Sequence, residues 1–406
     1  MNRSLLKKPA NTAFSQQRLK SSNPILTPKY AISILLAVGA ILIPLGIGLY
    51  IASEKVVEVS FDYSNCNQAS TSFTAPSNTQ GGVVSQWKYN PSSKTCTILF
   101  NIGQTMPQPV FLYYRLGNFY QNHRFYVKSI DKQQLLGKQG SCDSLTTLGR
   151  VTLSDLNRTF PGYGGPANTW LTPDDLQAYN STYYPCGLVA NSMFTDTFSN
   201  LTCYQSDGIP GNSGAPPCSP NNTTEVVYWW NVKNINWPSA DPVLYGYPSF
   251  VNSWDNTTLN KRLIPPPLWQ QLPAYKNGYN KNNFPDISTD EHFQVWMRVA
   301  ALPNFKKLYG RNDGMQLYPG TWSIDVVMNY DTELYSGTRS VVLSTVSFIG
   351  GKNPFLGLAY IGVGSLCILI SMGLVIANMV KPWSPGDHSK LGWVQQEQLM
   401  QRSGGQ

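Results

Sequence analysis

Two long runs of apolar residues stand near the two ends of the chain. Residues 30–52 contain no charged side chain and would span roughly 34 Å as an α-helix, which is long enough to cross a bilayer. Residues 355–380 are also free of charge and are followed by Lys381, whose ammonium group can extend to the aqueous interface. The pattern therefore predicts two transmembrane helices, at 30–52 and 355–380.

Between these runs, apolar and polar positions alternate with a period of two in several short segments. The segments are rich in β-branched and aromatic residues and are bounded by Gly, Pro and Asn, which is typical of strands. We therefore expect an antiparallel sheet or sandwich with strands at 56–61, 95–102, 110–116, 225–230, 322–330 and 339–348.

Two short helices are also indicated, one beginning near Thr172 and one near Ser288. The first has a capping threonine followed by a proline and two aspartates. The second has the spacing of a capping box between Ser288 and Glu291. We expect the turn-rich stretch 235–287 to cross the surface. The second helix would pack on the sheet through residues at helical spacing: Phe293, Trp296 or Met297, and Ala300.

The net charge of +8 lies mostly in the flanks of the apolar runs. Residues 1–29 carry six Lys and Arg and no acidic residue, so the positive-inside rule holds this tail in the cytosol. Residues 53–354 are nearly balanced, with 21 Lys and Arg against 20 Asp and Glu. Two spans then give cytosolic tails at 1–29 and 381–406 and a lumenal or extracellular domain, the ectodomain, at 53–354.

A cleaved signal peptide is the alternative interpretation of the first apolar run. That run is longer than the 7–15 residues of a signal-peptide core, and no A-x-A type cleavage site follows it. The sequence therefore favours a signal anchor that remains in the protein.

Six of the seven cysteines lie in the ectodomain, and Cys367 lies inside the second span. An even number of cysteines on the oxidising side of a membrane indicates disulfides. Fifteen pairings are open, and the short loops favour neighbours in sequence. The expected bridges are Cys66 with Cys96, Cys142 with Cys186, and Cys203 with Cys218.

N-glycosylation sequons concentrate in the same region. The sequon Asn-x-Ser/Thr, in which x is not proline, occurs at six ectodomain sites and elsewhere only at Asn2. These six candidate acceptors indicate a glycosylated, exposed face: Asn157, Asn180, Asn200, Asn221, Asn222 and Asn256.

Catalytic and metal-binding motifs are absent from the sequence. It has no G-x-S-x-G, no P-loop and no phosphorylatable D-K-T-G, and neither apolar run holds an ionisable residue for an ion pathway. A zinc site is the alternative to the disulfides, but no C-x-x-C pair occurs and the three histidines are scattered. We therefore expect a protein that is not an enzyme, with no catalytic residue, metal or cofactor.

Small residues on the two predicted spans offer close contact to another helix. The spans either pack on each other or dock on a partner, and the sequence leaves both open. The small residues are Ser33, Ala37, Gly39, Ala40, Gly46, Gly48 and Ala52 in the first span, and Gly357, Gly362, Gly364, Ser365 and Gly373 in the second.

Several long motifs carry a resemblance to a known family. They are PANTAFSQQRLK at 9–20, YYRLGNFYQNHRFYVKS at 113–129, PCGLVANSMFTDTF at 185–198, IPPPLW at 264–269, NFPDISTDEHFQVWMRVAALPNFKKLYG at 283–310 and FIGGKNPFLGLAYIGVG at 348–364. In this order, they resemble the accessory, or beta, subunits of type-IV P-type ATPases, the lipid flippases. That family is named for cell-division-cycle fifty and ligand-effect modulator three.

The resemblance implies a non-catalytic subunit that forms a heterodimer with a flippase. Such a subunit permits export of the ATPase from the endoplasmic reticulum and supports its transport of phospholipid toward the cytosolic leaflet. The resemblance also implies a two-span membrane protein with a mainly antiparallel β-sandwich ectodomain and a small α-helical part.

Two segments are candidates for contact with the partner. A cytosolic tail has no core of its own, so a motif specific in side chains indicates a binding segment. Its residues are Asn11, Thr12, Phe14, Gln16, Gln17, Arg18 and Leu19. In the ectodomain, Asn122, His123 and Arg124 could bind a partner's loops or cap a strand turn, and the sequence favours the structural role.

Two other functions share this layout. A trimeric ligand-gated channel has two spans and a Cys-rich glycosylated loop, although no polar pore residue supports it here. A lumenal receptor for glycan or lipid would use the nine ectodomain tryptophans, although aromatic residues are more often core.

Overall fold

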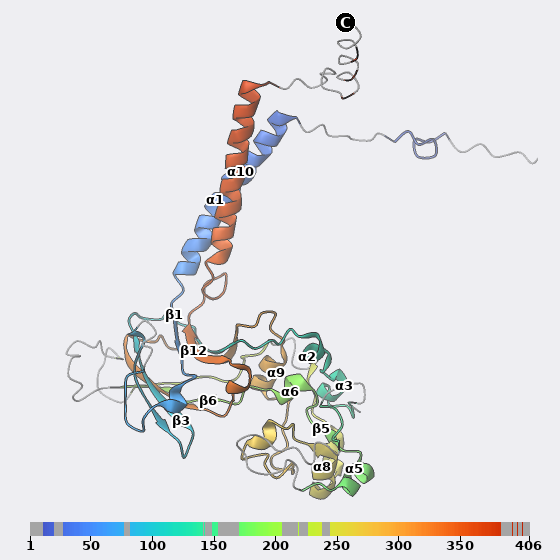
Figure 1. Ribbon diagram of the computed structural model, residues 1–406, viewed down its shortest axis with the longest axis vertical. Helices are drawn as coiled ribbons and strands as arrows, with labels where there is room; N and C mark the ends of the chain where they lie inside the picture. The colour runs from blue at the N-terminus through green and yellow to red at the C-terminus, as the bar shows by residue number, and fades with distance from the viewer. Residues whose placement is uncertain are drawn as a thin grey trace, which may run out of the picture. The chain divides into compact units, whose positions relative to one another are not determined.

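The computed structural model describes residues 11–19, 27–76, 82–140, 142, 148–152, 170–204, 218, 226–237, 244–382, 392, 396 and 400. The chain divides into two compact units. The two-helix unit comprises Met1–Glu54 and Asn353–Gln406, and the sheet unit comprises Lys55–Lys352. Figure 1 shows both as ribbons.

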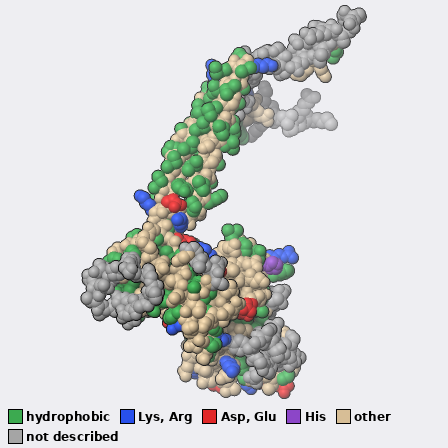
Figure 2. All heavy atoms as spheres, turned by 60° about the vertical axis from the view of Figure 1, so that its left-hand side comes forward, with side chains coloured by type: hydrophobic (Ala, Val, Ile, Leu, Met, Phe, Trp, Pro, Cys, Tyr) green, Lys and Arg blue, Asp and Glu red, His purple; other side chains and the backbone are tan. Residues whose placement is uncertain are grey.

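The two-helix unit is formed by α1 (Pro28–Glu54) and α10 (Phe355–Val380), which run side by side (Figure 1). Both helices are long and apolar enough to cross a membrane. Figure 2 shows hydrophobic side chains along the length of the pair. Most of these side chains are exposed within the chain, as is expected of helices whose surroundings are lipid.

The two helices contact each other through small residues spaced seven apart. A Cβ atom on Gly46 would lie 2.8 Å from Ile361 Cγ1 and 2.9 Å from the Gly357 carbonyl oxygen. A seven-residue period is the repeat of a left-handed supercoil, and small side chains let the two backbones approach. The buried positions are Gly39, Gly46 and Ser53 in α1 and Gly357, Gly364 and Ser371 in α10.

Some of the small residues in the spans pack against the other helix of this chain, and others do not. Ser33 and Ala37, which lie four apart, are exposed rather than packed on the other helix. Gly48, Gly362 and Gly373 have no neighbouring atom within 4 Å of a Cβ position. The buried small residues of the seven-residue series lie where α1 and α10 contact each other, together with larger side chains such as Ile361 and Ile368.

The sheet unit contains two antiparallel sheets. Sheet A has the strand order β1 (Glu58–Asp62), β12 (Thr338–Ser344), β4 (Val110–Gly117) and β10 (Phe305–Asn312). Sheet B has the order β2 (Val84–Asn90), β3 (Thr95–Ile102), β11 (Gly320–Val327), β7 (Leu201–Cys203) and β8 (Val227–Tyr228), and β6 (Thr197–Phe198) also pairs with β11. The predicted antiparallel architecture is confirmed.

Individual strands agree with the sequence to different degrees. The predicted strand at 95–102 is β3, and that at 110–116 is β4 with one more residue. The predicted strand at 225–230 is wrong in length, because β8 pairs only at Val227 and Tyr228. There the Asn200 Oδ1 atom accepts a hydrogen bond from Trp230 N (2.9 Å), so a side chain replaces the backbone partner.

The two sheets bury a common core between their inner faces. Phe61 of sheet A and Phe100 of sheet B have ring centroids 4.8 Å apart. Leu112 and Val341 of sheet A belong to the same buried cluster as Trp322 of sheet B. This contact makes the ectodomain a β-sandwich.

Sheet A is longer than the area that sheet B covers. The rest of its inner face carries the helical lobe, which we define as residues 118–136, 170–194 and 244–300. Tyr114 and Leu116 of β4 lie in this second core, together with Trp296 and Phe305. The helices of the lobe are α2 (Arg124–Lys128), α3 (Lys132–Leu135), α5 (Pro173–Tyr179), α6 (Leu188–Asn191), α8 (Asn256–Arg262) and α9 (Glu291–Met297).

The turn-rich stretch 235–287 differs from its prediction. It does not simply cross the surface, because Tyr245, Leu259, Trp269 and Tyr279 are buried in the second core. The segment also forms helix α8 and the strand β9 (Leu263–Ile264), which pairs in parallel with β5 (Thr182–Tyr183). Aromatic residues within an irregular segment supply this core, a feature that periodicity does not reveal.

Of the two predicted helix caps, the one at Thr172 is confirmed and the one at Ser288 is wrong. Helix α5 has the predicted cap at Thr172, and it is a capping box: Thr172 Oγ1 accepts from Asp175 N (3.2 Å) and Asp175 Oδ2 accepts from Thr172 N (3.0 Å). The predicted box between Ser288 and Glu291 is wrong. The cap of α9 is Asp290, whose Oδ1 accepts from Phe293 N (3.1 Å), and the helix ends at Met297 before it reaches Ala300.

Glu291 has a different role, since its carboxylate accepts hydrogen bonds from the backbone N–H groups of Asn234, Ile235 and Asn236 at 2.7–3.0 Å. It therefore holds a loop of the chain rather than the start of its own helix.

Three disulfides join cysteines that are neighbours in sequence. They link Cys66 to Cys96, Cys142 to Cys186, and Cys203 to Cys218. This is the pairing that short loops favour, and Cys367 in α10 is a free thiol.

We expect Gly46→Leu to separate α1 from α10. The larger side chain would overlap Ile361 and the Gly357 carbonyl, and overpacking of this kind typically costs about 1–3 kcal/mol. The measurement is oxidative crosslinking in membranes between cysteines introduced at Ile32 and Ser371, where Ser371 Oγ donates to the Ile32 carbonyl (3.3 Å), in a Cys367→Ala background. The crosslinking yield should fall in Gly46→Leu.

Gly48→Leu is the matched control, because a Cβ at that glycine has no neighbour within 4 Å in this chain. It should leave the crosslinking yield unchanged. Equal yields from both variants would contradict the packing described for Gly46.

Candidate partner-binding segments and an aromatic pocket

The tail residues 11–19 fold into one compact turn. The Thr12 hydroxyl donates to Ser15 Oγ (2.8 Å) and accepts from Ser15 N (3.1 Å). The Arg18 guanidinium donates to Asn11 Oδ1 (2.5 Å), which closes the turn. Gln17 has a φ of 53°, the left-handed conformation that often ends such a turn.

All nine residues of the turn are exposed, and two of them are large and apolar. Phe14 is 78% exposed and Leu19 is 62% exposed. Polar hydrogen bonds hold the backbone of the turn, whereas the side chains of Phe14 and Leu19 are left exposed. Asn11, Thr12 and Arg18 thus support the turn, and Gln16 and Gln17 lie on its exposed surface.

The candidates in the ectodomain, Asn122 to Arg124, have separate roles. Asn122 Nδ2 donates to the Ala301 carbonyl (2.9 Å) and so joins two loops of the sheet unit. His123 is the N-cap residue of α2 but makes no side-chain capping bond. Arg124 and His123 both pack on the ring of Phe125, at 4.8 and 5.6 Å from its centroid.

Around these residues lies an exposed apolar patch. Tyr120, Phe125 and Val127 are 59%, 49% and 41% exposed. The structural role favoured from the sequence therefore applies to Asn122, whereas His123 and Arg124 lie on a surface that is open to a partner.

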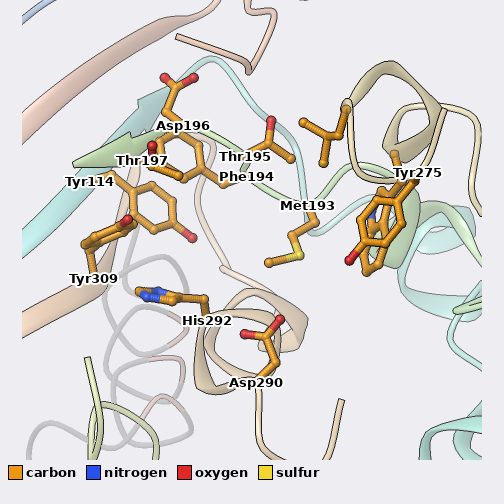
Figure 3. A pocket seen from close by; sticks show the side chains of 12 residues that line it. Tyr114, Met193, Phe194, Thr195, Asp196, Thr197, Tyr275, Asp290, His292 and Tyr309 are labelled. Carbon is orange, nitrogen blue, oxygen red and sulfur yellow. The ribbon is translucent and has the colours of Figure 1, made fainter. Parts of the chain in front are cut away.

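An aromatic pocket lies where the helical lobe meets β4 and β10 (Figure 3). It encloses about 220 Å³. Figure 3 shows Tyr114 and Tyr309 on one side, Tyr275 on the other, and Met193 and His292 directed between them. Twelve residues line it: Tyr114, Met193, Phe194, Thr195, Asp196, Thr197, Trp269, Leu272, Tyr275, Asp290, His292 and Tyr309.

The polar groups of this pocket do not form a catalytic arrangement among the described residues. His292 packs on the ring of Tyr309 (4.4 Å between centroids), and burial lowers the pKa of its imidazole, so the ring is neutral at neutral pH. Asp290 accepts its hydrogen bond from Phe293 N and so caps α9. The pocket suits an apolar or aromatic group.

Sequence reasoning missed this pocket because its residues come from five segments. The parts lie in β4, at 193–197, at 269–275, in α9 and in β10, which are up to about two hundred positions apart. No local spacing marks them, although the aromatic content of the chain indicated a large aromatic core.

Asp196, at the edge of the pocket, belongs to a buried ion pair. Its carboxylate accepts from Arg339 Nη1 (3.1 Å), Tyr63 Oη (2.8 Å) and Tyr330 N (2.7 Å). Burial raises the pKa of this carboxyl, and the Arg339 guanidinium opposes that rise. Arg339 also donates to the Tyr330 carbonyl, so both charges have partners.

Three of the six sequons fall on described residues. Asn180 and Asn256 are exposed, and Asn200 is half-buried. Asn157, Asn221 and Asn222 lie outside the described residues. A glycan requires an exposed side chain, so Asn180 and Asn256 are the better acceptor positions of the three.

One group of possible metal ligands occurs among the described residues. Asp131, Cys142 and Cys186 place their ligand atoms within 4.8 Å of one another, but the two sulfurs form a disulfide. Disulfide sulfur is not the thiolate that metals bind, so this group does not fit a metal ion.

Known proteins resemble this chain over nearly its whole length. The sequence model of the LEM3 (ligand-effect modulator 3) family, or CDC50 family, matches residues 49–384. The phospholipid-transporting ATPase accessory subunit CDC50 of Chaetomium thermophilum is 31% identical, over 96% of this chain and 91% of that protein. The phospholipid-transporting ATPase accessory subunit CRF1 of Saccharomyces cerevisiae is 33% identical, over 95% and 89%. Cell cycle control protein 50B of Homo sapiens is 32% identical, over 91% and 93%.

We expect Asp196→Asn to destabilise the sheet unit strongly. It leaves Arg339 buried without a charged partner, and breaking a buried pair typically costs about 3–5 kcal/mol. For a unit of this size, the Tm of the full chain in detergent should fall by about 5–15 °C. Thermal unfolding followed by tryptophan fluorescence measures this shift.

Asp313→Asn is the matched control, since it breaks the ion pair with Arg311 at the surface, where Asp313 is 52% exposed. Surface pairs contribute about 0–1 kcal/mol, so the Tm should change little. The same Tm in both variants would contradict the role given to the buried pair.

Proposed function

The chain belongs to the LEM3 (ligand-effect modulator 3), or CDC50, family, and from this we propose that it is the accessory subunit of a phospholipid-transporting P-type ATPase. The observation that carries the proposal is the match to accessory subunits over more than nine-tenths of the chain. The ATPase and this subunit form a heterodimer, and the phospholipid is moved by the partner.

Catalysis in this complex belongs to the partner. The chain lacks the D-K-T-G motif that P-type pumps phosphorylate, and His292 in the aromatic pocket packs on a tyrosine rather than on a nucleophile. The subunit contributes binding: it permits export of the ATPase from the endoplasmic reticulum and supports transport toward the cytosolic leaflet. The complex then resides in the Golgi, the endosome or the plasma membrane.

The proposed topology places both termini in the cytosol. The tails are 1–29 and 381–406, the spans are 30–52 and 355–380, and the ectodomain is 53–354. The basic residues of the first tail support this orientation, as do the three disulfides, which form on the oxidising side of a membrane. Glycans on the exposed Asn180 and Asn256 would lie on that same side.

Contact with the ATPase is proposed at two places. On the cytosolic side, the turn at 11–19 presents Phe14, whose exposed ring can enter a pocket of the partner. In the ectodomain, His123 and Arg124 lie with Phe125 in an exposed aromatic and basic patch. Asn122 contributes by fixing the loop.

Affinity purification tests the proposed function. The chain is tagged at its C-terminus, extracted from native membranes in mild detergent, and analysed by mass spectrometry for proteins present in stoichiometric amount. A large P-type ATPase with phospholipid-dependent activity is expected. Recovery of copies of this chain alone would contradict the proposal and favour the channel or the receptor.

We expect Phe14→Ala to reduce the amount of co-purified ATPase by about tenfold, since loss of an aromatic anchor in an interface typically costs 1–2 kcal/mol or more. Arg18→Ala should have a smaller effect in the same direction, because it removes only the bond that closes the turn. Lys29→Ala is the control within the same basic tail. The measurement is ATPase recovered per subunit, and an equal fall in the subunit's own abundance would contradict a contact role.

A further inference from the structure

The outer face of sheet A carries a cluster of charged side chains that no core covers. Arg115 of β4 and Lys306 of β10 are paired residues of adjacent strands, so their side chains lie on the same face. Both bind Glu58 of β1: Arg115 Nη2 lies 3.0 Å from Glu58 Oε1, and Lys306 Nζ lies 2.8 Å from Glu58 Oε2. One carboxylate thus faces two cations.

These residues line a polar pocket of about 580 Å³, which we call the outer pocket. Lys352 also lines the pocket, and the two cations Arg115 and Lys306 outnumber the single carboxylate of Glu58. Its remaining walls are the side chains of Thr338, Ser340, Asn304 and Phe305, and Gly117. A Cβ at Gly117 would collide with Thr338 Oγ1, so only a glycine, which has no side chain, leaves room at this part of the pocket.

Arg115 and Lys306 retain hydrogen-bond donors for a further ligand. Among the described residues, the Arg115 guanidinium bonds to Glu58 alone, with one of its five N–H groups. Lys306 likewise gives one of its three N–H groups to Glu58, while its ammonium lies 5.2 Å from the centre of the Tyr113 ring. The side chains of Arg115 and Lys306 are 38% and 31% exposed, so an anion can reach them.

The excess positive charge and the fork of N–H donors suit a phosphate group. Arginine binds phosphate through two parallel hydrogen bonds, and lysine adds a point charge. Threonine and serine hydroxyls at the wall can donate to the remaining phosphate oxygens.

The sequence positions of the pocket indicate where such a phosphate would come from. Glu58 lies four residues after the last residue of α1, and Lys352 lies three before the first residue of α10. Four residues of extended chain span at most about 14 Å. If the two helices cross the bilayer as proposed above, the chain holds these two residues near the phospholipid headgroups.

We propose that the outer pocket, through Arg115 and Lys306, binds the phosphate group of a phospholipid headgroup on the ectodomain side of the membrane. The inference rests on the topology given under the proposed function but does not require the ATPase. It assigns a lipid contact to the accessory chain itself. Because the headgroups are tethered beside the pocket, their effective concentration is high and a weak site is occupied.

Binding of soluble short-chain lipids to the purified full chain in detergent tests this. Dihexanoyl phosphatidylserine and dihexanoyl phosphatidylcholine are titrated by calorimetry, and inorganic phosphate is the free-phosphate probe. Phosphatidylserine should bind more tightly than phosphatidylcholine because the pocket has excess positive charge, and added salt should weaken both. Inorganic phosphate should bind at least tenfold more weakly than phosphatidylserine.

Variants of the cations and of the carboxylate should change the affinity in opposite directions. Arg115→Gln with Lys306→Gln should weaken phosphatidylserine binding at least tenfold. Glu58→Gln should strengthen it several-fold, because the cations lose their competing anion. A merely structural role for these residues would not produce a gain of affinity in Glu58→Gln.

The control removes the same charge elsewhere on the sheet unit. Lys276→Gln with Lys281→Gln changes two exposed lysines of the helical lobe and should leave the affinity within twofold of the parent chain. The Tm of each variant shows that it is folded.

Equal weakening in both double variants would overturn the proposal, because the effect would then be a general surface charge. Inorganic phosphate that binds as tightly as the lipid would also overturn it, since the pocket would be a free-anion site. Co-purification of an ATPase is measured separately on the same variants, so failure of the lipid site is distinguishable from failure of the accessory-subunit function.

Discussion

The buried ion pair between Asp196 and Arg339 is the contact on which the arrangement of the sheet unit depends. It draws together four parts of the chain: Tyr63 after β1, Asp196 before β6, Tyr330 after β11, and Arg339 in β12. These parts include strands or flanking residues of both sheets. Phe194 and Tyr330, which belong to the second core, lie 5.3 Å apart between ring centroids beside the pair.

A buried pair of this kind contributes more to specificity than to net stability. Desolvation of two charges offsets most of their attraction, so an apolar substitute of the same shape can be as stable. Each partner left alone is costly, however, and Asp196 has three donors in fixed directions. The pair therefore excludes alternative positions of β12 relative to the segment that carries Asp196. We infer that this constraint is what lets one sheet serve two cores.

The sequence predicted the parts of the fold whose signals are local. The apolar helices, the strands β3 and β4, the helix cap at Thr172 and the neighbouring disulfide partners all follow from nearby residues. Strand β10 was not predicted from the sequence, where Lys306 and Lys307 interrupt the alternation of apolar and polar residues. In the fold, Lys307 is buried and donates to the carbonyls of Val295 and Trp296 at the end of α9, and burial lowers its pKa to about 7. The carbonyl groups that bind Lys307 belong to another element, so the spacing of residues along the chain does not predict this contact.

The candidate sites also differ in whether their residues are local or distant in the sequence. The segment 11–19 was singled out from the sequence because its motif is continuous, and its partner-binding role stays a prediction. Its hydrogen bonds, such as Arg18 to Asn11, all lie within nine residues. The aromatic pocket and the outer pocket were not, because each is assembled by strand pairing from distant segments. Arg115 and Lys306 lie on the same face of sheet A because of the register between β4 and β10. That register is specified by the hydrophobic side chains that β4, β10 and β12 bury on the inner face.

An accessory subunit can shift the conformational equilibrium of its partner only through differences in binding affinity. It must bind some conformations of the ATPase more tightly than others, since a ligand with equal affinity for all states shifts none of them. A conformational change at a contact on one side of the membrane affects a contact on the other side only if the helices that connect them are stiff. The glycine series of α1 and α10 supplies such a connection, because two helices at backbone contact bend less readily than one. If the tail turn and the ectodomain both bind the ATPase as proposed, the close pairing of α1 and α10 would be part of the function, because a stiff pair of spans can favour one state of the partner.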